Sequence, residues 1–160
     1  MKMEIDYIKE IQEVEPEIKE EKLPNCMALI KQSFIVWYLL VEGNNEIEED
    51  YLQQTLNRNI SLINKFYPKN SELLFLQGWM IKISPWYFNL ESDEIGDKYL
   101  RLAYKYSPDN LLFKWALSEE SHTTQTTTER LEAFVLENLD KYYINYKPIQ
   151  EYFKNIVGRR

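Results

Sequence analysis

Apolar residues recur at every third or fourth position along most of the chain, which is the spacing of helices that bury one face. Eight segments show this spacing or are apolar nearly all round. They cover about residues 5–14, 25–43, 47–67, 71–83, 94–106, 110–121, 126–139 and 149–157. No segment shows the alternation of apolar and polar residues that is typical of a half-buried strand. The pattern predicts an all-α fold of about seven to eight antiparallel helices.

Residues that begin or end helices lie between these segments. Three asparagines are placed to cap the helices that follow them: Asn25, Asn70 and Asn110. Thr126, with Glu129 three residues later, forms a capping box that opens another helix. Pro16 is expected to interrupt the first helix, because proline lacks the N–H that a helix interior uses. The polar run 121–128 reads as a solvent loop.

Three prolines recur every 40 residues, and each closes a basic-aromatic stretch: Pro68, Pro108 and Pro148. The first two are followed by asparagine two residues later and then by the apolar run Leu-Leu-Phe. Pro148 also suits the first turn of a last helix. A fixed period of this length is typical of stacked helix pairs, since one pair cannot bury its own apolar face.

Small residues lie where the helices of such pairs would cross: Gly78 and Ser118, each eight residues after a capping asparagine, and Gly96 and Ala103, ahead of Pro108. On these residues and the prolines the chain resembles the tetratricopeptide family, whose repeat has 34 residues. The likeness covers 70–110 best. The period of 40 exceeds the family's 34 by six residues, and this excess is most easily absorbed near 84–92. The resemblance implies helix pairs stacked around a concave groove that binds a peptide or protein, without catalytic activity.

The 160 residues have the length of one domain, with N-terminal helices at 1–43 and repeat-like helix pairs at 44–160. The densest apolar run, 33–41, is too short to span a bilayer, and charges near the N-terminus do not suit a secretory signal. We expect a cytoplasmic protein that does not bind membranes. Cys26 is the only cysteine, so no intramolecular disulfide is expected.

Charge is unevenly placed on this chain, whose formal net charge is −7. Acidic residues concentrate at 10–21, 42–50 and 91–97, and the pair 159–160 is the only basic tip. The first run reads as a solvated helix face. Nucleic acid is not an expected ligand, because phosphate binding needs a basic face. An acidic surface instead steers basic partners toward the protein.

The segment 84–92 is the main candidate site. Trp86, Tyr87 and Phe88 are consecutive, so they cannot all face one way, and a ring left outside would make an anchor for a partner. Acidic residues follow them and would recognise lysine or arginine. The predicted partner-binding residues here are Trp86, Tyr87, Glu91, Asp93, Glu94 and Asp97. The alternative is that the aromatic rings fill a gap between helices.

A second acidic cluster is also predicted to bind a partner: Glu46, Glu48, Glu49 and Asp50. The alternative is that these carboxylates stabilise the start of a helix through its dipole. Both interpretations place them near the N-terminus of the third helix.

Catalytic patterns are scarce in the sequence. Cys26 and His122 are the only pair that could form a nucleophile and its base, and no local signature accompanies them. One cysteine and one histidine cannot build a tetrahedral metal site without several carboxylates. No glycine-rich phosphate loop is present. We expect a protein that is not an enzyme and needs no cofactor or metal.

Two functions fit these observations. In size, charge and helical build the chain is similar to the immunity proteins with which bacteria neutralise basic toxins, often nucleases. The alternative is a tetratricopeptide-like adaptor that holds a peptide or helix of a larger complex. In either case we expect a protein partner and a monomer or 1:1 heterocomplex.

Overall fold

The computed structural model describes residues 6–19, 22–44, 46–118 and 125–158, and this part of the chain forms helices and no strands. The all-α prediction of about seven to eight helices is therefore confirmed. The helices are α1 (Tyr7–Lys19), α2 (Cys26–Glu42), α3 (Glu49–Phe66), α4 (Ser71–Ile83), α5 (Glu94–Tyr106), α6 (Leu111–Ala116), α7 (Gln125–Glu137) and α8 (Lys147–Ile156). Two short 3₁₀ helices are η1 (Pro85–Phe88) and η2 (Leu139–Lys141).

The asparagine caps are where the sequence predicts them. The side-chain oxygens of Asn25, Asn70 and Asn110 each accept a hydrogen bond from the backbone N–H three residues later, at 3.0, 3.0 and 3.1 Å. Pro68 and Pro108 lie in the turns just before two of these caps. Pro148 lies instead in the first turn of α8, so the third proline of the period is not structurally equivalent to the other two.

Three helix boundaries differ from the predictions. Helix α1 continues through Pro16, because Pro16 and Gln12, whose carbonyl loses its N–H partner, are both exposed to water. Helix α6 ends at Ala116 rather than near residue 121. After Ala116, the N–H groups of Leu117 and Ser118 donate to carbonyls three residues earlier instead of four. Helix α7 begins at Gln125, so the expected loop 121–128 is helical from that residue onward. Residues 119–124 lie outside the described part.

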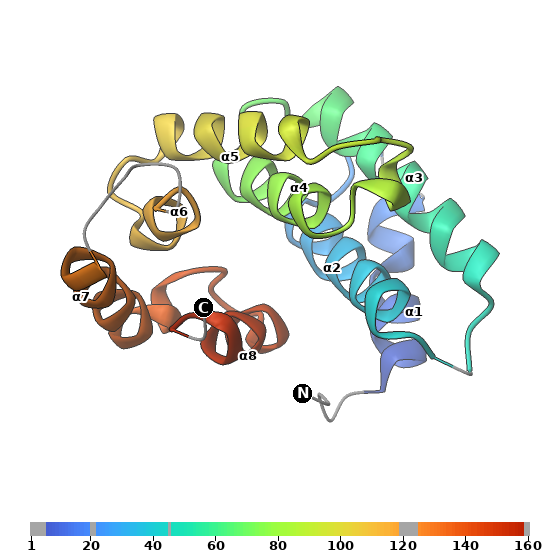
Figure 1. The fold of residues 1–160 in the computed structure, drawn as a ribbon. Helices are drawn as coiled ribbons and strands as arrows, with labels where there is room; N and C mark the ends of the chain where they lie inside the picture. Colours follow the sequence, from blue (N-terminus) through green and yellow to red (C-terminus); the bar gives the residue numbers. More distant parts are fainter. Residues whose placement is uncertain (1–5, 20–21, 45, 119–124, 159–160) are drawn as a thin grey trace.

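The helices pack as antiparallel pairs in a curved stack, α1 with α2, α2 with α3, α4 with α5 and α6 with α7 (Figure 1). Helices α2, α4 and α6 line its inner side, and α3 and α5 lie on its outer side. This placement explains the sequence pattern, since α2 and α4 are covered on two sides and are apolar nearly all round. Helices α3 and α5 are covered on one side and are amphipathic.

Helices α4 and α5 approach most closely where two glycines face each other. A Cβ built on Gly78 would lie 2.8 Å from the carbonyl oxygen of Gly96, and one built on Gly96 would lie 2.8 Å from the carbonyl oxygen of Gly78. Both neighbours are backbone atoms, which cannot move aside as a side chain can. The small residues noted in the sequence at these two positions therefore permit this helix contact.

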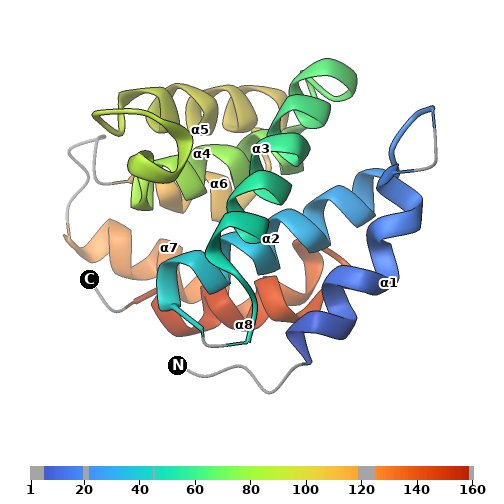
Figure 2. The ribbon, with the colours of Figure 1, turned by 90° about the vertical axis from the view of Figure 1, so that its right-hand side faces the viewer.

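The C-terminal helix α8 lies on the side of α4 opposite to α5 (Figures 1 and 2). The ring of Tyr152 lies 5.5 Å from that of Phe34 on α2, and the ring of Phe153 lies 5.4 Å from that of Trp79 on α4. The segment before α8 adds Tyr143, which is buried and donates a hydrogen bond of 2.6 Å to the carbonyl of Glu72. Thus α8 and this segment cover the inner side of the stack.

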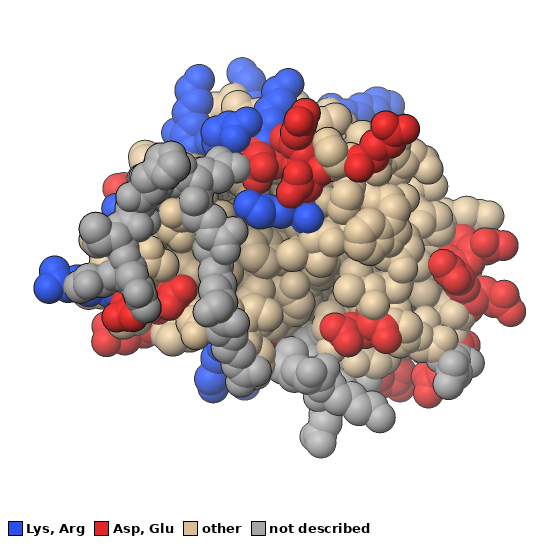
Figure 3. All heavy atoms as spheres, in the orientation of Figure 1, with Lys and Arg blue, Asp and Glu red and all other residues tan. Residues whose placement is uncertain are grey.

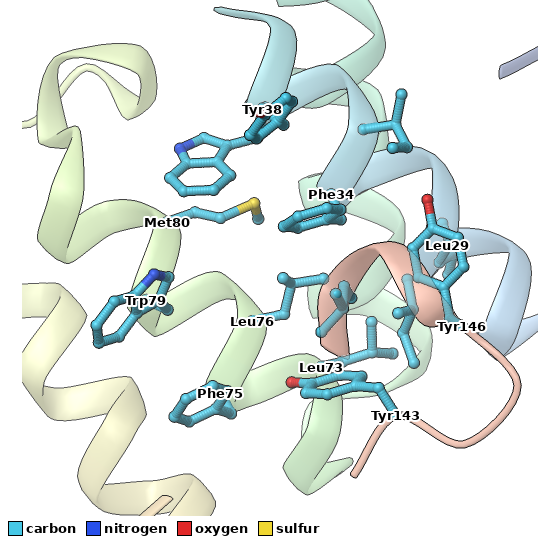
Figure 4. Packing of buried hydrophobic residues seen from close by; sticks show 14 of the residues in the cluster. Leu29, Phe34, Tyr38, Leu73, Phe75, Leu76, Trp79, Met80, Tyr143 and Tyr146 are labelled. Atoms are coloured by element: carbon cyan, nitrogen blue, oxygen red, sulfur yellow. The ribbon is translucent and has the colours of Figure 1, made fainter. Parts of the chain in front are cut away.

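Side chains from α2, α4 and the segment before α8 converge in the core, as the close-up shows (Figure 4). The labelled rings and aliphatic groups include Phe34, Leu76 and Tyr146, which are at most 3% exposed. The ring of Tyr146 meets the ring of Phe34 edge-on at 6.2 Å. One continuous apolar core therefore joins helices that are far apart in the sequence.

A polar network joins α1, α2 and α3 at one edge of the core. The Arg58 guanidinium forms an ion pair with the Glu15 carboxylate, and Gln32 donates a hydrogen bond of 2.7 Å to the same carboxylate. Asn59 donates to the Gln32 oxygen at 3.0 Å. The bond from Arg58 holds the pKa of Glu15 below its ordinary value. Glu15 therefore departs from the expectation that the acidic run 10–21 is a solvated face.

Candidate protein-binding surface

The predicted aromatic segment forms η1, a turn that separates its three rings. Ser84 ends α4 and is buried, accepting a hydrogen bond of 2.8 Å from Trp37 Nε1 and donating one to the carbonyl of Met80. Pro85 then opens η1, and Asn89 ends it in the left-handed region with φ 56°. As a result Trp86 is 63% exposed, whereas Tyr87 and Phe88 are half-buried and pack against the core.

Two hydrogen bonds hold this turn against α2 and α3. The Tyr87 hydroxyl donates to the carbonyl of Leu40 at 2.7 Å, and Gln53 Nε2 donates to the carbonyl of Tyr87 at 2.9 Å. The rings of Trp86 and Tyr87 lie 5.8 Å apart. Trp86 is therefore an exposed indole on an anchored backbone, and a partner that binds it would lose little backbone freedom on this side.

The acidic residues after η1 do not all share one environment. Glu91, Asp93 and Glu94 are exposed and form no ion pair with other described residues. Asp97 forms an ion pair of 3.1 Å with Lys82, and only 18% of its side chain is exposed. One turn of α5 carries Asp97 inward against α4, so its charge is already matched within the chain.

The second acidic cluster is divided between two sides of α3. Glu49 and Asp50 precede Gln53 by four and three residues, so they lie on the face of α3 whose Gln53 side chain reaches Tyr87. Glu46 and Glu48 instead line a different groove, between α1 and the start of α3. Glu49 and Asp50 thus lie on the same side of α3 as η1, and the other two carboxylates do not.

The groove between α1 and α3 has a volume of about 370 Å³. Its lining is largely apolar: Ile8, Ile11, Gln12, Glu46, Ile47, Glu48 and Tyr51. Tyr51 is 47% exposed, so this groove presents part of an aromatic ring to water. This mixture of exposed apolar groups and carboxylates is a second, weaker candidate for partner contact.

Charge is grouped on the surface in a way the linear sequence conceals (Figure 3). Acidic side chains gather over the starts of α3 and α5. Basic side chains gather over α5 beyond its start, where Lys98, Arg101 and Lys105 are exposed and spaced to share one face. This basic face is not visible in the linear sequence, because residues three and four apart become neighbours only on a helix.

A further groove lies beside η1, between α3, α4 and α5, with a volume of about 270 Å³. Phe88, Asn89 and Leu90 belong to the segment 84–92 that the sequence singles out, but the lining residues from α3, α4 and α5 are not among the sequence predictions. Gln77 belongs to it, and its position inside the apolar run of α4 gives no signal that it would line a groove. The groove can be recognised only when the packing of these helices is known.

The groups considered for catalysis do not form a site in the described residues. Cys26 is half-buried, and burial, aided by the charge of Glu72, raises the pKa of its thiol. His122 lies outside the described residues. Within the described ranges no three side chains of His, Cys, Asp or Glu are grouped as metal ligands would be. No described helix has both the length and the apolar content needed to cross a bilayer.

Comparison of the chain with protein-family models, with curated proteins and with solved structures gives no match. The resemblance to tetratricopeptide repeats therefore remains one of spacing and small residues. What the chain does has to be argued from its surface.

Proposed function

We propose that the chain is a protein-binding module that holds a basic partner on the Trp86 surface, which comprises Trp86, Glu49, Asp50, Glu91, Asp93 and Glu94. The exposure of Trp86 on an anchored turn is the observation that carries the proposal. Exposing a large indole to water is unfavourable, and tryptophan is enriched among residues that dominate binding energy. The carboxylates nearby favour lysine and arginine on the partner.

We further propose that this partner is a toxin and that the chain is its immunity protein. A small, acidic, helical protein needs only a few aromatic anchors and several carboxylates to cover a cationic active site. The basic face of α5 supports a single orientation of the complex. A cationic partner is attracted to the acidic groups over the starts of α3 and α5 and repelled by the basic groups further along α5. A nuclease is the toxin class that this arrangement suits best.

The adaptor function receives less support. A peptide in the concave side of the stack would contact α2, α4 and α6, and the rings of Tyr152 and Phe153 on α8 already occupy that side. Such a peptide would have to displace α8, whose Phe153 ring is buried against α4 and α6. We therefore place the partner on the outer surface beside η1.

The test begins with affinity capture from the source cells, followed by purification of the captured protein and measurement of its binding. We expect a basic partner whose association rate falls steeply with salt, and whose enzymatic activity one equivalent of the chain abolishes. Trp86→Ala should weaken binding by about thirtyfold, the loss typical of an anchor residue, with little change in melting temperature.

Phe134→Ala is the matched control, since Phe134 is 54% exposed on α7, far along the chain from η1. Equal binding by wild type and Trp86→Ala would refute the proposed surface. A partner that keeps its activity when saturated would instead favour an adaptor over an inhibitor.

A further inference from the structure

The groove beside η1 has walls from four parts of the fold. It is lined by Asn57 and Ile60 of α3, Gln77 and Ile81 of α4, Phe88, Asn89 and Leu90 around the end of η1, and Ile95 and Tyr99 of α5. None of these nine side chains carries a formal charge at neutral pH. Its volume of about 270 Å³ falls just below the roughly 300–1,000 Å³ of sites for drug-sized ligands. It therefore suits a single side chain rather than a large molecule.

Gln77 is the unusual member of this lining. Its side chain is only 2% exposed, and its Oε1 has no hydrogen-bond partner among the described residues. Buried polar atoms are nearly always paired, because an unpaired acceptor loses its water without compensation. Gln77 lines the groove, so a group bound there can supply the donor that Oε1 lacks among the described residues.

The lining decides which kind of group fits. An aliphatic side chain would leave Gln77 unpaired. A lysine or arginine head group would be desolvated against neutral side chains, with no carboxylate in the lining to balance its charge, which is costly. A side chain with an apolar ring and one neutral donor satisfies both the apolar walls and the amide.

We infer that this groove receives a tyrosine or tryptophan side chain of the partner, whose hydroxyl or indole N–H donates to Gln77. The inference rests on the proposed function, because the groove shares η1 with the Trp86 surface through Phe88. A partner seated on Trp86 lies beside the groove mouth, where Ile95 is 42% exposed. The complex would then have two anchors: Trp86 of this chain, which the partner covers, and an aromatic side chain of the partner, which enters the groove.

The probes are capped tripeptides with a central tyrosine, tryptophan, phenylalanine or lysine, titrated into the full ¹⁵N-labelled chain and followed by NMR. We expect shifts confined to the groove, including the Gln77 side-chain amide, with dissociation constants on the order of 1 mM. The tyrosine peptide should bind about tenfold more tightly than the phenylalanine peptide, because only its hydroxyl pairs with Gln77.

Two variants separate the hydrogen bond from the cavity. Gln77→Met keeps the volume and should abolish the preference for tyrosine over phenylalanine. Ile95→Trp, at the exposed mouth, should fill the groove and block every probe, while the melting temperature stays that of the wild type.

The inference is overturned if phenylalanine binds as well as tyrosine, if lysine binds best, or if the shifts lie outside the groove. Binding of free p-cresol without binding of the tyrosine peptide would assign the groove to a small molecule and also overturn it. These results do not depend on Trp86→Ala, so failure of the groove and failure of the Trp86 surface can be told apart.

Discussion

Trp86 is exposed because of the contacts that its neighbours make. Ser84 is fixed by Trp37, and Tyr87 is fixed by Leu40 and Gln53, so Trp86 is the one side chain of η1 that is left mostly exposed. A flexible loop could fold an indole back onto the core. Here the same contacts that stabilise α4 and its following turn prevent that movement, so the proposed binding surface needs no rearrangement of this turn before it meets a partner.

The carboxylates of the Trp86 surface are expected to act on the rate of association. Replacing Glu91, Asp93 and Glu94 by lysine should slow association with the partner about tenfold at low salt, because the local field then repels a basic surface. Asp97 is left unchanged, since its loss would break the ion pair with Lys82. Stopped-flow association at several salt concentrations measures the effect.

The matched control replaces three exposed acidic residues elsewhere by lysine: Glu137, Asp140 and Glu151. Its net charge equals that of the first variant. If both variants slow association equally, then overall charge and not the Trp86 surface attracts the partner.

Among the elements, the pair α4 and α5 depends most on two single positions. Gly78→Ala should lower the free energy of unfolding by about 2 kcal/mol, because the added methyl group meets backbone atoms of α5 that cannot yield locally. Gly96→Ala should do the same for the reciprocal reason. Urea denaturation of each variant measures the change.

The opposite outcome is easy to recognise. Replacing glycine by alanine inside an exposed helix stabilises it by about 1 kcal/mol through helix propensity alone. A gain of that size at either glycine would mean that α4 and α5 do not approach each other as closely as the structure places them.

The bounds of α4 and α5 follow from the sequence because strong local signals surround them. Asn70 and the turn before it begin α4, and Ser84-Pro85 ends it, so the expected range 71–83 is the observed one. Pro16 gives an equally strong signal that is wrong, since an exposed helix edge tolerates the missing bond. Local signals decide a boundary only when the surroundings do not compensate for them.

The site could be predicted only in part, for a related reason. Consecutive aromatic residues indicate that the three rings cannot all face one way, but which ring is left outside depends on Leu40 and Gln53, which are distant in the sequence. The groove with Gln77 depends on how three helices meet. Periodicity shows which face of a helix is buried, and it does not show what buries it.

At the scale of the whole molecule, stability should depend on pH through the network around Glu15. Its pKa is lowered in the folded state by Arg58, so its ionised form stabilises the fold. This contribution is present in full above its ordinary pKa of 4.5 and is lost as the pH falls through the lowered value.

We expect Glu15→Gln to lower the free energy of unfolding at pH 7 by about 1 kcal/mol, a value reduced for partial exposure. The difference from wild type should vanish at acidic pH. Denaturation of both proteins across pH 2–7 measures this difference. Burial raises the pKa of Glu72, but Glu72 is present in both proteins, so its contribution cancels in the difference. Glu17→Gln, at an exposed position of the same helix, is the control, and an equal pH-dependent loss there would contradict the assignment to Glu15.

Helix α8 also affects the molecule as a whole. Its rings contact α2, α4 and α6 together, so the early hairpins are joined through a late segment and not only through their neighbours in the stack. On the ribosome, α8 emerges after every helix that it covers. Until then the aromatic faces of α2 and α4 remain open, and the nascent chain should be a substrate for chaperones that bind exposed hydrophobic segments.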